Sequence, residues 1–261
     1  FPCASITRQI KGNQMTEFGL LKSRGIIGFS DVNKTIQNTE LMSRIMNYAS
    51  DIDVLIMQHA EDYDLSKNSC IDQGEVATRL GLQGVSDIAE KIIIERDLSL
   101  LSEFSCRYHI NQISSKNSLN VIKKNKSNGI KFSTGVSINN LSLNHNDIGE
   151  FRTFLKLSPP LRSEEDRLSL IEGISNDLID VIVSDHIPED EESKRLPFAQ
   201  AATGSIGIET LLSLSLELYH NKSLPLEKII KCLTINPAKI LKINKGTLQE
   251  GSDADICIFD L

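Results

Sequence analysis

The chain has 261 residues and a formal net charge of −7, and no basic stripe stands out, so nucleic acid is a poor candidate partner. No apolar run is long enough to cross a bilayer, and the five cysteines are scattered without CxxC spacing. We therefore expect a cytoplasmic protein with reduced thiols and with neither nucleic acid nor membrane as a partner. A hydrophobic content of 40% is enough for one large domain.

Short apolar runs alternate along the chain with longer amphipathic stretches. We expect six strands, at residues 1–6, 25–29, 53–58, 108–113, 130–136 and 179–183. Helices are expected at 39–48, 86–102 and 163–174, and the last begins with a capping box formed by Ser163 and Asp166. This alternation predicts an α/β fold with a parallel sheet, and no glycine-rich phosphate loop follows any strand. Polar residues at several strand ends favour a (β/α)8 TIM-type barrel, of which about six strands are present.

The last part of the chain departs from this alternation. Residues 223–243 have a helical pattern that we expect to break at Asn236-Pro237. Residues 254–259 then have the pattern of a strand that follows turn residues and lies outside the barrel. We therefore divide the chain into a barrel domain, residues 1–242, and a remnant of a small β-sandwich, residues 243–261.

Two side chains at strand ends are candidates for metal-assisted hydrolysis. A metal-dependent hydrolase brings several His and carboxylate ligands to one or two cations, and a nearby carboxylate takes the proton of a metal-bound water. His59 follows the strand at 53–58 and is a candidate ligand. Asp185 follows the strand at 179–183 and is a candidate ligand and general base. For either residue taken alone, a hydrogen-bonded structural role stays an open alternative.

A series of short motifs extends over essentially the whole chain. In order, they are HAED (59–62), GEVATRLG (74–81), ERD (95–97), PPLRSEEDR (159–167), SDH (184–186), LPFAQAA (196–202), GIET (207–210), NPA (236–238) and GSDAD (251–255). Together they resemble the dihydroorotases, in the cyclic amidohydrolase branch of the amidohydrolase superfamily. The resemblance implies an amidohydrolase barrel beside a small β-sandwich.

The same resemblance implies an activity, a cofactor and site residues. The reaction is the hydrolysis, or the reverse closure, of the cyclic amide of dihydroorotate in de novo pyrimidine synthesis, with carbamoyl-aspartate as the open form. The implied cofactor is zinc. Asp185 matches the residue that is both metal ligand and base, and His59 matches a ligand. A homo-oligomer is expected. The family's His-x-His strand would precede residue 1, so the chain looks like an N-terminally truncated fragment.

Several positions depart from the family pattern. The second Asp of an Asp-Asp-Gly motif, a metal ligand, is Val32 here, and another ligand His is Gln112. His109 lies three residues before Gln112, so strand alternation predicts that it faces the other way. At substrate-binding positions the family's Asn is Ser158 and a family His is Glu189, and the family's pair of loop histidines is Asn139-Asn140.

These departures leave three hypotheses open. In the first, hydrolase activity is lost or much reduced, no metal is needed, and the barrel is a structural partner of aspartate transcarbamoylase. In the second, a reduced zinc site still hydrolyses dihydroorotate. In the third, the substrate is another cyclic ureide, such as hydantoin or allantoin. A His-x-His pair upstream would favour the second, because two ligands rarely hold a catalytic zinc.

Overall fold

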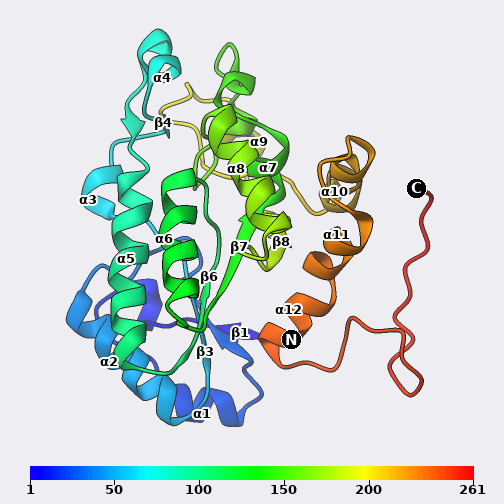
Figure 1. Cartoon of the computed structure of the whole chain (residues 1–261). Helices are drawn as coiled ribbons and strands as arrows, with labels where there is room; N and C mark the ends of the chain where they lie inside the picture. Colours follow the sequence, from blue (N-terminus) through cyan, green and yellow to red (C-terminus); the bar gives the residue numbers. More distant parts are fainter.

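The computed structural model describes all 261 residues, and its centre is a curled parallel sheet of six strands (Figure 1). The strand order is β1-β2-β3-β6-β7-β8, and every neighbouring pair is parallel. The strands are β1 (Cys3–Ala4), β2 (Gly28–Phe29), β3 (Leu55–Gln58), β6 (Arg107–Ile110), β7 (Ser133–Ser137) and β8 (Val181–Val183). The six predicted strands are confirmed. Because β1 and β8 are edges and do not pair, the sheet is an open half-barrel.

Helices cover the outer face of this sheet and bury its core. The long ones follow the strands: α2 (Thr39–Asp51), α5 (Ile88–Glu103), α6 (Lys116–Ser127) and α8 (Glu164–Ser175). In Figure 1, α5, α6 and α8 stand next to one another. Their buried faces, with the outward-facing strand residues, form one cluster of 35 apolar residues. The expected capping box is present, since the Ser163 and Asp166 side chains bond each other's backbone N–H.

Shorter elements complete the fold. They are α1 (Phe18–Ser23), α3 (Tyr63–Ser66), α4 (Glu75–Leu80), α7 (Ile138–Ser142), α9 (Glu191–Lys194), α10 (Leu211–His220), α11 (Leu226–Leu233), α12 (Ile235–Leu241) and the 3-10 turns Arg8–Ile10, His145–Ile148 and Thr153–Leu155. None of the helices combines the length and apolar character of a membrane span.

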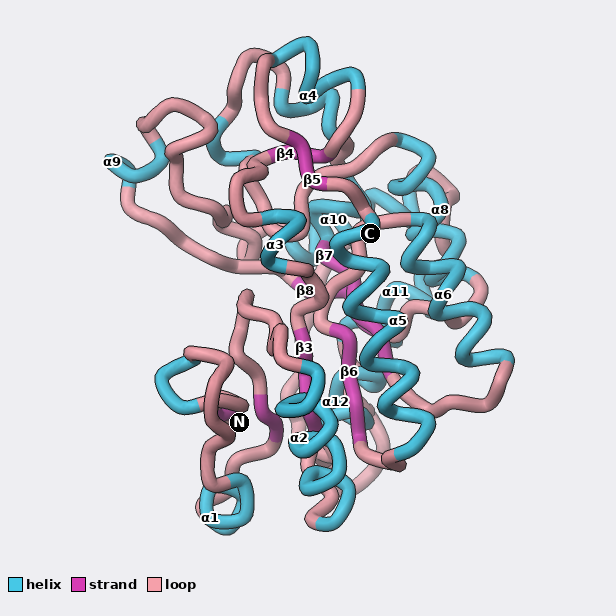
Figure 2. The backbone as a smooth tube through the Cα atoms, turned by 90° about the vertical axis from the view of Figure 1, so that its left-hand side faces the viewer, coloured by secondary structure: helices cyan, strands magenta, loops and turns pink.

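A second, two-stranded sheet escaped the sequence analysis. It consists of β4 (Ile71–Asp72) and β5 (Gly84–Val85), which pair in parallel on either side of α4. Figure 2 shows this unit at the end of the molecule opposite α1, beyond the ends of the central strands. A strand of two residues is too short to show an alternating pattern, so only the tertiary structure reveals it.

The end of the chain differs from expectation in two ways. The helical stretch breaks at Thr234, whose φ and ψ are −127° and −83°, and Pro237 lies in the first turn of α12. This is a position where the missing N–H of proline costs nothing. Residues 254–259 form no strand here, and the tail runs alone beside α10 and α11 (Figure 1). A strand needs a partner to bond its backbone, so the assignment of 243–261 to a β-sandwich stays a prediction.

Candidate functional site

A cavity of about 380 Å³ lies at the carboxyl ends of β2, β3, β6 and β8. It brings together five of the positions that the sequence singled out: Val32, His59, Gln112, Ser158 and Asp185. They come from segments up to 153 residues apart in the chain, Val32 and Asp185 being the extremes. This is the face where parallel barrels carry their active sites, and the role of these residues in a site stays a prediction.

Asp185 leaves β8 in an unusual backbone conformation and meets Gln112. Its φ of 50° lies in the left-handed region, which Asp tolerates better than most residues. The Gln112 side-chain amide donates a hydrogen bond from Nε2 to Asp185 Oδ1 at 2.7 Å. Burial raises the pKa of Asp185, while the hydrogen bond from Gln112 opposes this effect. The carboxylate is therefore held by a neutral amide.

His59 is buried directly after β3 and lies beside two further polar groups. Its Nε2 is 3.4 Å from Glu61 Oε2 and 3.3 Å from Ser158 Oγ. Burial alone would raise the pKa of Glu61, but the hydrogen bonds from His59 and Ser158 and the nearby charges outweigh it and lower that pKa. The sequence analysis did not single out Glu61 as a site residue. Its place in the HAED motif, two residues after His59, was the available signal.

Val32 occupies the first degenerate ligand position and has nothing with which to bind a cation. Its side chain is 60% exposed, and its backbone has a φ of 59°. A β-branched residue is rarely found in this left-handed conformation, because its side chain crowds the backbone. The Val32 N–H is held by the Ser30 hydroxyl at 3.0 Å. This turn thus keeps a shape that suits Asp, Asn or Gly better than Val.

His109 lies in the same cavity as Gln112, so the prediction that it faces away is wrong. The strand β6 ends at Ile110, and alternation cannot be extended beyond that residue to Gln112. The His109 Nδ1 is 2.8 Å from the Ser133 hydroxyl. Burial, with a smaller contribution from the Lys126 charge, lowers the pKa of His109 to about 4. The imidazole is therefore neutral at physiological pH.

Three other positions singled out from the sequence lie outside the cavity. Glu189 is exposed in the acidic loop before α9 and does not line the cavity, so its role in substrate binding stays a prediction. Asn139 and Asn140 are buried in the first turn of α7. Their side chains donate to Ser205 Oγ at 3.4 Å and to the Pro160 carbonyl at 3.0 Å, which are structural contacts.

The donor set does not fit a catalytic zinc centre by itself. Such a centre takes three protein ligands, commonly His, Cys, Asp or Glu. Of the four candidate ligand positions, His59 and Asp185 carry such groups, while Val32 and Gln112 do not. Nowhere in the protein do three or more such side chains converge in a way that could hold a metal ion. No catalytic step through a metal follows from these residues.

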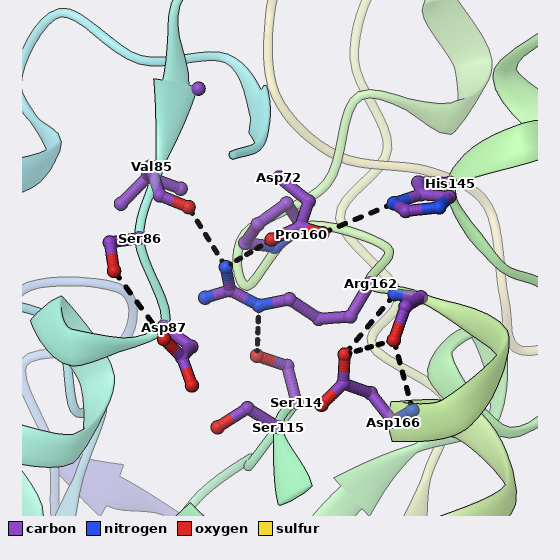
Figure 3. A network of polar contacts seen from close by, with 12 residues as sticks. Asp72, Val85, Ser86, Asp87, Ser114, Ser115, His145, Pro160, Arg162 and Asp166 are labelled. Carbon is purple, nitrogen blue, oxygen red and sulfur yellow. Dashed lines mark hydrogen bonds and ion pairs between the residues drawn. The ribbon is translucent and has the colours of Figure 1, made fainter. Parts of the chain in front are cut away.

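A buried polar network surrounds Arg162, four residues after Ser158 in the chain (Figure 3). Arg162 comes from the loop that also carries Ser158, and it is only 4% exposed. Its Nη1 donates to Asp72 Oδ1 at 2.7 Å and to the Val85 carbonyl at 2.9 Å, and its Nε donates to Ser114 Oγ at 3.0 Å. The guanidinium thereby ties the β4–β5 unit to the segment that follows β6.

The network continues on both sides of Arg162. On one side, His145 Nδ1 lies 3.1 Å from the second oxygen of Asp72. On the other, the buried carboxylate of Glu90, at the start of α5, accepts hydrogen bonds from both the N–H and the hydroxyl of Ser114. Each buried charge in this network therefore has a partner of opposite charge or several hydrogen bonds, which buried ions require.

Comparisons with known proteins agree with this architecture. The dihydro-orotase-like family model matches residues 1–118. A dihydroorotase of Ehrlichia canis is 42% identical over 99% of this chain and 58% of its own length, and one of Syntrophus aciditrophicus is 40% identical over 100% and 61%. The chain thus spans about three fifths of the length of these curated relatives.

Solved structures share the fold. An L-hydantoinase (dihydropyrimidinase) from Arthrobacter aurescens matches with a TM-score of 0.77 and 27% identity, over 91% of this chain and 56% of its own. A dihydropyrimidinase from Brevibacillus agri matches with a TM-score of 0.76 at 19% identity, over 90% and 55%, which speaks for the fold alone. The sequence relatives, the family model and the half-barrel together show that this chain belongs to the dihydroorotase-like family of the amidohydrolase superfamily.

Proposed function

We propose that this chain is the barrel part of a dihydroorotase-like protein of pyrimidine synthesis in which hydrolase activity is lost or much reduced. Its role would then be that of a structural partner, with aspartate transcarbamoylase as the proposed companion enzyme. The relatives named dihydroorotase support the family assignment. The proposal about activity comes from the side chains in the Asp185 cavity.

The observation that carries this proposal is the hydrogen bond of 2.7 Å from Gln112 to Asp185. In the family pattern, a His at position 112 and the Asp at 185 would both face a metal. Here the side-chain amide of Gln112 donates its N–H directly to the Asp185 carboxylate. Amide groups also bind transition metals poorly compared with imidazole. Asp185 thus has a hydrogen-bond partner within the protein, as is expected of a buried carboxylate without a metal.

An active enzyme with a reduced zinc site is the second candidate. It is favoured by the placement of His59 and Asp185 in one cavity, where the positive charge of a protonated His59 would lower the Asp185 pKa. Dihydroorotate or carbamoyl-aspartate would be its substrate. A hydrolase of another cyclic ureide is the third candidate, favoured by the likeness to the L-hydantoinase at 27% identity.

The deciding experiment measures metal and turnover on the same sample of full-length protein. Zinc per chain would be determined by mass spectrometry after gentle purification, and dihydroorotate and hydantoin turnover would be followed with and without added zinc. We expect no bound zinc and no turnover. About one zinc per chain, with turnover abolished in Asp185→Ala but not in Glu103→Ala, an exposed carboxylate at the end of α5, would refute the proposal in favour of an active enzyme.

The structural role has a separate test. Full-length protein would be mixed with aspartate transcarbamoylase from the same organism, and the masses of the species would be measured by analytical ultracentrifugation. A stable mixed complex supports the partner role, and two independent sedimenting species contradict it. The same experiment on the protein alone checks the expected homo-oligomer.

A further inference from the structure

Lys156 is a buried lysine that has no carboxylate partner. It lies just before Ser158 in the loop beside the Asp185 cavity, and it is 8% exposed. Its Nζ donates to the carbonyl oxygens of Ala199 at 2.9 Å and Ala201 at 2.8 Å. Burial lowers the pKa of Lys156, and no carboxylate opposes that effect. An ammonium group has three N–H donors, so one remains for another acceptor.

A second buried lysine binds the same loop. The Nζ of Lys194 donates to the carbonyl oxygens of Ala202 at 2.9 Å and Gly204 at 2.6 Å. Its charge and that of Lys156 repel each other, and the exposed Glu189 is the one acidic group that acts on the Lys194 pKa. Burying positive charge without a counter-ion is costly, even where carbonyls accept the hydrogen bonds. The positive charge of Lys156 and Lys194 therefore favours the binding of an anion near these two side chains.

Lys156 lines a cavity of about 230 Å³ where such a charge fits. Five other lining residues carry hydroxyl groups: Tyr63, Ser66, Ser69, Ser158 and Thr203. Ser66 and Ser69 already donate to backbone carbonyls and Ser158 donates to Glu61, so the hydroxyls of Tyr63 and Thr203 remain for a ligand. Hydroxyl donors and one ammonium group are the usual partners of a carboxylate or a phosphate. The space beside Lys156 therefore suits a polar, negatively charged group.

Two charged groups on the rim must be weighed against this. Glu61 also lines the cavity, but its carboxylate already contacts the ring of His59 and the hydroxyl of Ser158. Lys67 adds a positive charge, which its neighbour Asp64 compensates at 2.8 Å. Of the two lysines at this cavity, Lys156 is therefore the one without a carboxylate partner.

We propose that this Lys156 pocket is a binding site for a small oxyanion, either a carboxylate or a phosphate group. Ser158 lines both the Lys156 pocket and the Asp185 cavity. A ligand can therefore place its anionic group against Lys156 while the rest of it extends into the Asp185 cavity. The site follows from charge and geometry alone, and it requires neither a metal nor turnover.

The test is a thermal-shift titration of the full-length protein with inorganic phosphate and, separately, with succinate. Sodium chloride keeps the ionic strength constant, and EDTA is present, so the result is independent of whether the barrel holds zinc. We expect a melting temperature that rises saturably with one or both anions. The two arms distinguish a phosphate from a carboxylate site. A shift no larger than that of chloride with both anions would overturn the proposal.

Three variants locate the site. The saturable shift should be lost in Lys156→Gln and retained in Lys194→Gln, the matched control in which the other buried lysine is changed. Thr203→Val leaves both lysine contacts in place and should weaken binding about fivefold, as expected for one lost hydrogen bond. If Lys156→Gln does not fold, the Thr203→Val variant becomes the test of the site. An anion affinity in Thr203→Val equal to that of wild type would mean that the anion binds elsewhere and would refute the site.

Discussion

The Asp185 cavity and the Arg162 network share one loop, residues 158–162, but differ in how their side chains are satisfied. In the cavity, Val32 is exposed, and a single hydrogen bond joins Gln112 to Asp185. In the network, Arg162 and Asp72 are both buried, and Arg162 alone bonds three separate segments. A substitution in the cavity therefore leaves few polar groups without a partner. A substitution in the network leaves a buried charge without its partner.

This difference explains how the barrel would keep its fold if Val32 and Gln112 replace metal ligands, as proposed above. A metal ligand at the mouth of a barrel stabilises the fold mainly through the metal, so its replacement by Val or Gln costs the fold little. A buried ion is different, because the removal of one partner exposes the other to the full cost of desolvation. The intact PPLRSEEDR motif belongs to the second class, since Arg162 lies within it.

The largest expected effect is that of Arg162→Met. This change leaves the Asp72 carboxylate without its guanidinium partner and removes the donor to Ser114, and we expect a loss of about 3–5 kcal/mol in the free energy of unfolding. Urea denaturation of the full-length protein would measure it. Arg195→Met is the matched control, because the Arg195–Glu191 pair is exposed on both sides and should contribute about 0–1 kcal/mol. Equal losses in the two variants would mean that the Arg162 network stabilises the fold no more than an exposed ion pair does.

A smaller effect is expected from His109, the one strongly perturbed histidine of the cavity. Its pKa falls from an ordinary value of 6.5 to about 4, so the folded state favours the neutral ring. The stability that this provides is complete above pH 6.5 and is lost as the pH falls toward 4, by up to about 3 kcal/mol. In His109→Asn this pH dependence should disappear.

Urea denaturation of both proteins at pH 7, 5.5 and 4 measures the effect. The difference in unfolding free energy between wild type and His109→Asn should shrink steadily as the pH falls. His220→Asn is the control, because His220 is exposed at the end of α10. A constant difference across the three pH values would mean that the His109 ring is solvated and that the cavity tolerates a charge there.

The smallest expected effect is a gain in stability. Val32→Asn places a residue that tolerates the left-handed conformation where Val is strained, and we expect about 1 kcal/mol of added stability. Ile208→Asn, at another exposed apolar position, serves as control and should stay within about 0.5 kcal/mol of wild type. The melting temperature of each variant provides the measurement. A loss of stability in Val32→Asn would show that the turn is not strained.

The sequence alone determined the six central strands and three of the four long helices, at 39–48, 86–102 and 163–174, and it predicted a site at the carboxyl ends of the strands. These depend on local information: apolar periodicity, caps such as Ser163, and the polar residues that follow each strand. The motifs and their order were enough to place His59, Asp185 and the two degenerate positions near one another, at the carboxyl ends of the strands.

Only the tertiary structure decided which side chains satisfy one another. That Gln112 donates to Asp185, that His109 shares their cavity and that Lys156 is buried without a counter-ion depend on the packing of segments far apart in the chain. The same holds for the two-residue strands β4 and β5, which exist because their backbones pair with each other. Local sequence patterns do not predict which distant residues become partners. The free-energy cost of burying a polar group depends on whether it has such a partner.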